Sequence, residues 1–247
     1  MLQLTDLHAG YGKLTVLRGI SLTIGPGETV GIFGRNGAGK TTLMNAILNL
    51  VHVTAGEVWL GGQRIDGRAT ESIVRRGLSL VPQSRGNFAS QTVTENLRLA
   101  CFGGGIQRGD YRARLDEVFA RFPPLASRRD VLASNLSGGE QQMLAISKAL
   151  MRRPKVLLLD EPSIGLAPRV VEQLAETVRE LRGRDLAIVV TEQNIQWVLE
   201  LVDQVHILDQ GRIVESLQPT GERADEAQRV IASYLGEIES AGADGRS

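Results

Sequence analysis

The sequence predicts an α/β fold built around a mostly parallel sheet. Strand-like and helix-like stretches alternate through most of the chain, which favours strand–helix–strand units. Residues 156–160 form a continuous apolar run, of the kind that is covered on both faces in a parallel sheet. The alternation is lost between about residues 85 and 152, where no convincing strand is found. This interruption predicts a helical subdomain inserted into the α/β core.

Length and composition are those of an ordinary globular protein. The 247 residues are 42% hydrophobic and 23% charged, which fits one large domain or a core with an inserted subdomain. Lys plus Arg balances Asp plus Glu at 28 each, so bulk charge does not indicate a nucleic-acid partner. The single cysteine, Cys101, excludes an internal disulfide framework, fits a reducing compartment and is expected to fill apolar space.

Neither a membrane span nor a signal peptide is predicted. No apolar run approaches the roughly 20 residues that a spanning helix needs. The N-terminal residues lack the charged-then-apolar layout of a secretory signal. We therefore expect a cytoplasmic chain that acts at a membrane only through a partner.

The first third of the chain is expected to be rich in strands. Alternation and apolar runs predict strands at residues 2–7, 16–24, 29–33, 56–62 and 78–83. Short helices are expected at residues 42–48 and 70–76. Tyr11 lies in the glycine turn after the first strand, where it could stack on an adenine ring or be a half-buried turn aromatic. Spacing alone does not choose between these two interpretations.

The rest of the chain is expected to be helical first and then α/β again. Helices are predicted at residues 92–101, 109–122, 139–151, 168–182, 195–202 and 222–235, with Phe122-Pro123-Pro124 marking a stop. Strands are predicted at residues 156–160, 186–190, 205–208 and, after a hairpin-like turn, 212–214. The tail over residues 236–247 is rich in Gly, Ser, Ala and acid, and we expect it to be frayed and disordered.

A glycine-rich motif between the strand at 29–33 and the following helix predicts phosphate binding. The motif is Gly34-Arg35-Asn36-Gly37-Ala38-Gly39-Lys40-Thr41-Thr42. Strand, glycine-rich turn and helix are the context that a P-loop requires. Its backbone N–H groups and the positive helix end can cradle phosphates, while Lys40 reaches the terminal phosphates and Thr41 ligates Mg²⁺. The chain is therefore predicted to bind a nucleoside triphosphate.

Two acids, Asp160 and Glu161, end the buried strand at 156–160. Carboxylates at such a position are costly to desolvate unless they meet a cation or transfer a proton. Asp160 is the natural outer partner of the Mg²⁺, and Glu161 the natural base or polariser for an attacking water. The alternative is a pair of solvated acids that cap the strand end.

A second glycine-containing stretch, Leu136-Ser137-Gly138-Gly139-Glu140-Gln141-Gln142, opens the helix at 139–151. Ser137 and Glu140 fit a capping box, which is the purely local interpretation. A cap does not need two consecutive glycines, each of which costs a helix about 1 kcal/mol. Ser137, Gly138 and Gly139 therefore suit a second phosphate-binding device. With one P-loop and one such device in each chain, both could close on one nucleotide only if two copies face each other head to tail.

These motifs, in this order, resemble those of the ATP-binding cassette family of transport ATPases, and the similarity covers nearly all of residues 2–235. The resemblance implies a P-loop NTPase core at residues 1–84 and 153–235, with an antiparallel β subdomain and a helical subdomain at 85–152 that carries the Ser137 motif. It also implies a dimer that sandwiches two ATP molecules, each between one copy's P-loop and the other copy's Ser137-Gly138-Gly139.

The resemblance also implies roles for single residues. Tyr11 matches the aromatic that stacks on adenine, and Gln83 matches the glutamine that senses Mg²⁺ and the attacking water and couples to the membrane subunit. Gln193 stands where the family usually has a histidine that hydrogen-bonds the γ-phosphate; glutamine can donate a hydrogen bond but takes up no proton, which leaves proton abstraction to Glu161. Ala167 stands where many members have an aspartate, so one contact across the dimer is expected to be absent.

Motif details, including Gly165-Leu166-Ala167-Pro168 and Glu192-Gln193-Asn194, resemble one branch of the family, the ATPases of branched-chain amino acid uptake systems. The resemblance implies an ATP-hydrolysing importer subunit on the inner face of the membrane, with Mg²⁺ as cofactor. Its implied partners are a second ATPase subunit, integral permease subunits and, indirectly, a substrate-binding protein. The alternatives are a urea or amide importer, an exporter, or a soluble cassette ATPase that acts on ribosomes or DNA. The last kind commonly has two cassettes, long coiled-coil insertions or basic arms, and none is found here.

Overall fold

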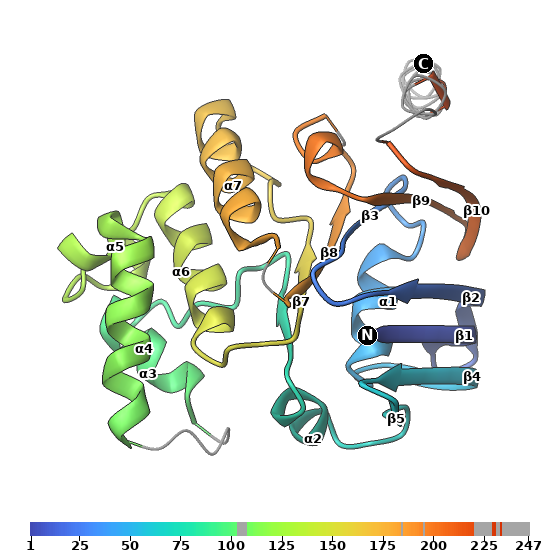
Figure 1. Ribbon diagram of the computed structural model, residues 1–247, viewed down its shortest axis with the longest axis horizontal. Coiled ribbons are helices and arrows are strands. Elements are labelled where there is room, and N and C mark those ends of the chain that lie inside the picture. Colours follow the sequence, from blue (N-terminus) through green and yellow to red (C-terminus); the bar gives the residue numbers. More distant parts are fainter. Residues whose placement is uncertain (103–107, 184, 195, 220–228, 231–232, 234–247) are drawn as a thin grey trace.

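The computed structural model describes residues 1–102, 108–183, 185–194, 196–219, 229–230 and 233. Over these ranges the chain forms two sheets and a group of helices (Figure 1). Most of the helix predicted at 222–235, and all of the tail predicted to be frayed, lie outside the described residues.

The central sheet has six strands in the order β10-β9-β3-β8-β7-β6. Their bounds are β3 Thr29–Phe33, β6 Leu78–Val81, β7 Val156–Asp160, β8 Ala187–Glu192, β9 Gln204–Asp209 and β10 Arg212–Leu217. The five strands from β9 to β6 run parallel, and β10 pairs antiparallel at the edge. Every residue of β3, β7 and β8 is buried, as expected for parallel strands covered on both faces. The mostly parallel sheet is confirmed.

A second, antiparallel sheet has the order β2-β1-β4-β5. Its strands are β1 Leu2–Tyr11, β2 Leu14–Ile24, β4 His52–Leu60 and β5 Gln63–Arg64. Helix α1, Lys40–Ile47, shares one buried apolar cluster with both sheets, because Leu43 and Met44 lie with Leu4 of β1 and Val189 of β8. The helix thus joins the two sheets, and its first turn faces the end of β3 (Figure 1).

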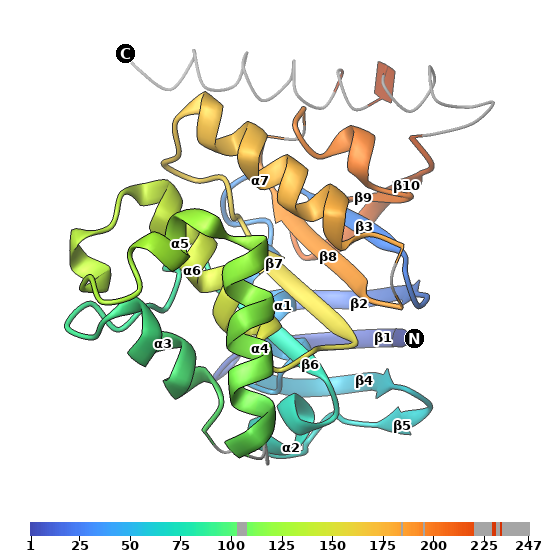
Figure 2. The ribbon, with the colours of Figure 1, turned by 60° about the vertical axis from the view of Figure 1, so that its left-hand side comes forward.

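The remaining helices gather mainly on the other face of the central sheet (Figure 2). They are α2 Thr70–Arg75, α3 Val93–Ala100, α4 Arg108–Arg121, α5 Pro123–Ser127, α6 Gly138–Leu150 and α7 Pro168–Leu181. Leu144 of α6 and Val178 of α7 share a buried cluster with Leu159 of β7. Between residues 85 and 152 the described chain has helices and one isolated bridge, Thr92 to Leu132, which agrees with the predicted loss of strands. None of the helices described here combines the length and apolarity needed to cross a bilayer.

One local prediction is wrong, and a second is confirmed with an addition. The helix predicted at 195–202 is a turn followed by a 3₁₀ helix at Leu199–Leu201. The apolar spacing that suggested a helix arises because Val198 and Leu201, three residues apart, are both buried in the core by this short connection. The stop at Phe122-Pro123-Pro124 does end α4, but Pro123 also begins α5, since proline suits the first helical position.

Candidate nucleotide site

The turn between β3 and α1 presents unsatisfied backbone donors. Gly39 precedes α1 with φ 110°, a left-handed conformation that glycine adopts without strain, and makes no side-chain cap. The first N–H groups of α1 are therefore left without a capping side chain. A Cβ at Gly34 would lie 2.3 Å from the carbonyl oxygen of Leu208, so only glycine lets the loop pack against β9. The segment from Arg35 to Gly37 is exposed, which leaves the turn open to a ligand.

Lys40 is buried and paired inside this site. Its Nζ donates to the carbonyl oxygens of Gly34 at 2.7 Å and Arg35 at 3.2 Å. The same Nζ lies 2.9 Å from Oε1 of Glu161, and both side chains are nearly inaccessible to solvent. Removing either partner of a buried ion pair destabilises a protein, because the other partner is left as an uncompensated buried charge. The Lys40 cation and the carboxylate of Glu161, the residue directly after β7, are thus brought together.

The ends of β7 and β8 place the other acid and its partners. Asp160 Oδ1 accepts a hydrogen bond of 2.7 Å from Thr191 Oγ1 of β8. Burial raises the pKa of the Asp160 carboxyl, although hydrogen bonds from Thr191 and Thr41 act in the opposite direction. Gln83, in the loop after β6, donates to Glu161 Oε2 at 3.3 Å. We call Lys40, Gln83, Asp160, Glu161 and Thr191 the Lys40 cluster.

Glu161 has an unusual backbone conformation. Its φ of 44° lies in the left-handed region, which non-glycine residues rarely adopt. Its N–H donates to the carbonyl oxygen of Thr191 at 3.0 Å and to Thr191 Oγ1 at 3.1 Å. Thr191 therefore fixes both acids at once, through the backbone of one and the carboxylate of the other.

Gln193 and Tyr11 lie outside this cluster. Gln193 follows β8 and is exposed, and within the described residues no hydrogen bond joins its side chain to the cluster. Tyr11 ends β1, and 51% of its surface is exposed. It belongs to neither buried apolar cluster, so its ring is free to meet a planar ligand.

Sequence reasoning missed Glu192. The predicted strand ended at Val190, but β8 runs two residues further, and this buries Glu192. Its Oε1 accepts a hydrogen bond of 3.0 Å from the N–H of Ser163, in the turn after Glu161. Burial raises the pKa of this carboxyl to about 7. The sequence signal for Glu192 was an acid close after an apolar run. In the structure Glu192 links the turn after β7 to the segment that carries Gln193.

The Ser137 motif forms the predicted capping box at the start of α6. Ser137 Oγ accepts from the N–H of Glu140 at 3.3 Å, and Glu140 Oε2 accepts from the N–H of Ser137 at 2.8 Å. The two glycines differ in their surroundings. A Cβ at Gly139 would lie 2.7 Å from Val170 Cγ1 of α7, whereas a Cβ at Gly138 meets nothing closer than 3.7 Å. Gly139 is therefore required by packing, and Gly138 leaves an open surface.

The loop after Gln83 is tied to α6 by contacts that the sequence did not reveal. Arg85 donates from Nε to Gln142 Oε1 at 3.2 Å and from Nη1 to Gln141 Oε1 at 3.1 Å. Asn87 Nδ2 donates to the carbonyl oxygen of Gln141 at 2.8 Å. Within the described residues no hydrogen bond or ion pair joins Ser137, Gly138 or Gly139 to the P-loop of the same chain. Figure 1 shows α6 and α1 on opposite sides of β7.

Comparisons with known proteins agree with this geometry. A family profile described as "ABC transporter" matches residues 17–164. BraG of Pseudomonas aeruginosa, a high-affinity branched-chain amino acid transport ATP-binding protein, is 38% identical over 236 residues, which are 96% of this chain and 100% of BraG. LptB of Haemophilus influenzae, a lipopolysaccharide export system ATP-binding protein, is 32% identical over 94% of this chain and 95% of LptB. A solved structure of an ATP-binding subunit of an ABC transporter matches with TM-score 0.82 and 26% identity over 97% of this chain and 99% of that one.

Proposed function

The chain belongs to the ABC transporter family and is an ATPase, and we propose that it powers a membrane importer of branched-chain amino acids. The observation that carries this proposal is the likeness to BraG, which extends over essentially the whole length of both proteins. The substrate is argued from that likeness alone, because an ATP-binding subunit need not touch the transported molecule.

The Lys40 cluster supports a role for Glu161 in hydrolysis. Lys40 is bonded to two loop carbonyls and to the Glu161 carboxylate. The phosphates of ATP offer Lys40 a stronger anionic partner, so binding exchanges Glu161 for phosphate oxygens. The freed carboxylate of Glu161, held on its other oxygen by Gln83, can then polarise the attacking water. Gln193 donates a hydrogen bond to the γ-phosphate in this mechanism.

Mg²⁺ fits the oxygen atoms that surround this cluster. Thr41, Gln83 and Asp160 supply a hydroxyl, an amide oxygen and a buried carboxylate whose charge burial disfavours. No group of three or more His, Cys, Asp or Glu side chains in the described part of the chain is placed to hold a metal. Mg²⁺ in proteins keeps waters and takes one or two carboxylates together with substrate phosphates, so Asp160 would be its carboxylate here. When bound, the ion would balance the charge of the phosphates.

The two glycine motifs support a nucleotide site shared between two subunits. Tyr11 would stack on the adenine, and residues 34–42 would hold the phosphates. The exposed Ser137 and Gly138 of a second cassette subunit would cover the γ-phosphate from the other side. That subunit is a copy of this chain or a homologue. ATP closes the pair, and hydrolysis lets it separate.

Coupling to the membrane follows from the loop after Gln83. Arg85 and Asn87 connect this loop to α6, so movement at Gln83 is passed to the predicted helical subdomain at 85–152. We infer that this subdomain docks on integral permease subunits and that the core at 1–84 and 153–235 binds nucleotide. The chain would then be cytoplasmic, peripheral on the inner face of the membrane, with a substrate-binding protein as an indirect partner.

Uptake of radiolabelled leucine into cells tests the proposal. Deletion of the gene should abolish ATP-dependent uptake, and the wild-type chain, but not Glu161→Gln, should restore it. The variant Glu172→Gln is a matched control, because Glu172 is exposed on α7, away from the cluster. Unchanged leucine uptake after deletion would refute the amino acid assignment while leaving the ATPase activity intact.

An exporter is the second candidate, because LptB is similar over nearly its whole length. Co-purification separates the two candidates. An importer subunit should be isolated with permeases that also require a substrate-binding protein, whereas an exporter subunit should be isolated with permeases that need none.

A further inference from the structure

A basic cavity lies at the edge of the central sheet opposite to the nucleotide site. Its volume is about 450 Å³, and its lining includes the basic side chains Arg75, Arg76, Arg114, Arg152, Arg153 and Lys155. Asp110 is the one acidic residue in this lining. We call this feature the basic cavity.

The strand β7 separates the basic cavity from the Lys40 cluster. Lys155 directly precedes the first residue of β7, and Asp160 is its last residue. Five residues of extended strand span about 16 Å. The cavity therefore opens at the amino ends of β6 and β7, whereas the P-loop nucleotide site lies at their carboxyl ends. An occupant of one site does not reach the other.

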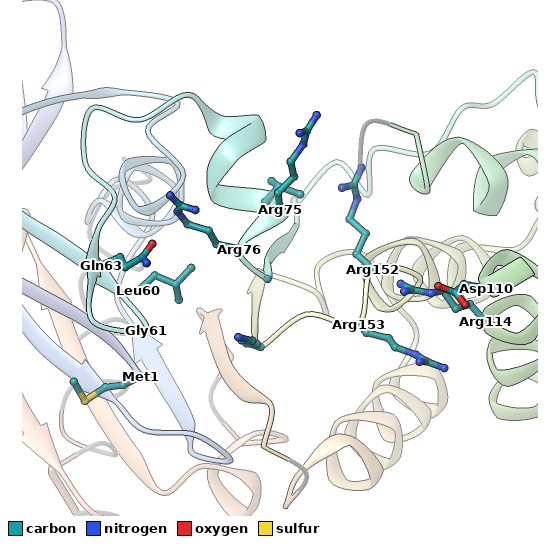
Figure 3. Close-up of a pocket in the computed structure, with 13 residues that line it drawn as sticks. Met1, Leu60, Gly61, Gln63, Arg75, Arg76, Asp110, Arg114, Arg152 and Arg153 are labelled. Carbon is teal, nitrogen blue, oxygen red and sulfur yellow. The ribbon is translucent and has the colours of Figure 1, made fainter. Parts of the chain in front are cut away.

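The cations of the cavity come from three parts of the fold, which are the end of α2, helix α4 and the segment between α6 and β7. Figure 3 shows Arg75 and Arg76 at the end of α2 on one side, Arg152 between, and Arg114 with Asp110 on α4 at the other side. The backbone fixes the floor, because the carbonyl oxygen of Gly77 accepts from the N–H groups of Lys155 at 2.7 Å and Val156 at 3.0 Å. These bonds join the segments that precede β6 and β7, and both segments line the cavity.

Much of this positive charge has no acidic partner. Arg153 pairs with Glu117 and Arg75 with Glu71. No carboxylate of the described residues forms an ion pair with any of Arg76, Arg114, Arg152 or Lys155.

Some N–H donors of the arginines that line the basic cavity have no hydrogen-bond acceptor. Arg114 donates from Nη1 to the carbonyl oxygen of Met151 at 2.8 Å, and Arg152 from Nη2 to that of Phe102 at 2.7 Å. The Nε atoms of Arg76 and Arg114 are buried without any acceptor. Buried polar groups in proteins are normally hydrogen-bonded. Unneutralised guanidinium groups around one cavity are what a multivalent anion would satisfy.

We propose that the basic cavity binds a small, multiply charged phosphate-bearing anion, such as a phosphorylated metabolite. The guanidinium fork bonds phosphate oxygens in pairs, and arginine predominates here over lysine. The volume lies within the roughly 300–1,000 Å³ of ordinary small-molecule sites. Since the antiparallel sheet, at Leu60 and Gln63, and helix α4 both line the cavity, a bound anion would hold these two parts in one relative placement.

The test is calorimetric titration of inorganic pyrophosphate into the full chain with saturating ADP, so that the P-loop is already occupied. The wild type should bind one equivalent, and the affinity should fall as salt is raised. The double variant Arg76→Gln, Arg114→Gln should weaken binding by about a hundredfold, about tenfold for each lost charged hydrogen-bond pair. ADP affinity and ATP turnover should not change.

Controls keep the result interpretable. The pair Arg179→Gln, Arg212→Gln removes the same charge at exposed positions outside the cavity and should bind pyrophosphate like the wild type. If the double variant does not fold, Lys155→Gln replaces it, because Lys155 is exposed and should still weaken binding. Wild-type protein that binds no pyrophosphate, or variants that bind it equally well, would overturn the proposal. It would also be overturned if only vesicles of phosphatidylglycerol and phosphatidylcholine bound through these arginines, since the site would then be a membrane contact.

Discussion

The two helices that begin with glycine motifs are built differently. Helix α1 follows an uncapped glycine, and its first turn carries the buried Lys40, which pairs with one of two neighbouring buried carboxylates, Asp160 and Glu161. Helix α6 begins at Ser137, which is capped by its own Glu140, and its Ser137 and Gly138 are exposed. Charged side chains that can take part in catalysis lie at the start of α1, whereas the start of α6 is exposed and uncharged at Ser137 and Gly138. Neither is complete as a site for a triphosphate, which is why we propose that two subunits combine them.

The largest expected effect lies at the charged helix start. Glu161→Gln should lower the rate of ATP turnover by about a thousandfold, within the range typical of a lost general base. ATP binding should remain, because the phosphate contacts of the P-loop are untouched. Steady-state hydrolysis and nucleotide binding measure both quantities, with Glu172→Gln as the control that keeps wild-type turnover. Turnover within about tenfold of the wild type would show that Glu161 does not polarise the water.

The bare helix start is tested with Gly138→Leu. The nearest atom to a Cβ at this position lies 3.7 Å away, so the larger side chain should be tolerated in the single subunit. It would, however, fill the surface offered to the other subunit's nucleotide, and turnover should fall by about a hundredfold, comparable with the loss of a preorganised donor. Wild-type turnover in a folded Gly138→Leu protein would mean that α6 takes no part in the site.

The difference between the two helix starts was only partly predictable from sequence. The P-loop, Asp160 and Glu161 follow from local patterns, because each lies at the end of a buried strand or directly after it, and the apolar runs identify these strands. Glu192 was missed, since strand ends are set by pairing, and β8 continues to Glu192 beside Phe33 of β3. The packing role of Gly139 depends on Val170, which is distant in sequence, so no local pattern indicates it.

The buried acid Glu192 should make stability depend on pH. Burial raises the folded-state pKa of Glu192 to about 7, above its ordinary value near 4.5, so the folded protein binds the proton more tightly than the unfolded chain. The free energy of unfolding should therefore fall as pH rises through this interval. When the pH is raised from about 5.5 to about 8.5, the free energy of unfolding should fall by about 2 kcal/mol more in the wild type than in Glu192→Gln. Urea unfolding at the two pH values measures this, and equal pH dependence in both proteins would contradict it.

The smallest effect separates the two glycines of α6. Gly139→Ala should reduce the free energy of unfolding by about 1–2 kcal/mol, because its Cβ overpacks against Val170. Gly138→Ala should not be destabilising, since alanine favours the helix and its Cβ meets only ordinary contacts. Thermal unfolding of the pair checks this, and equal destabilisation would show that both glycines serve packing.

The shared site is tested most directly by sedimentation velocity of the Glu161→Gln protein, alone and with any second cassette subunit that co-purifies with it. With saturating MgATP the account predicts a stable pair of cassettes, and without nucleotide separate subunits. If this variant stays monomeric with saturating MgATP while the monomeric wild type hydrolyses ATP at its full rate, the shared site is contradicted.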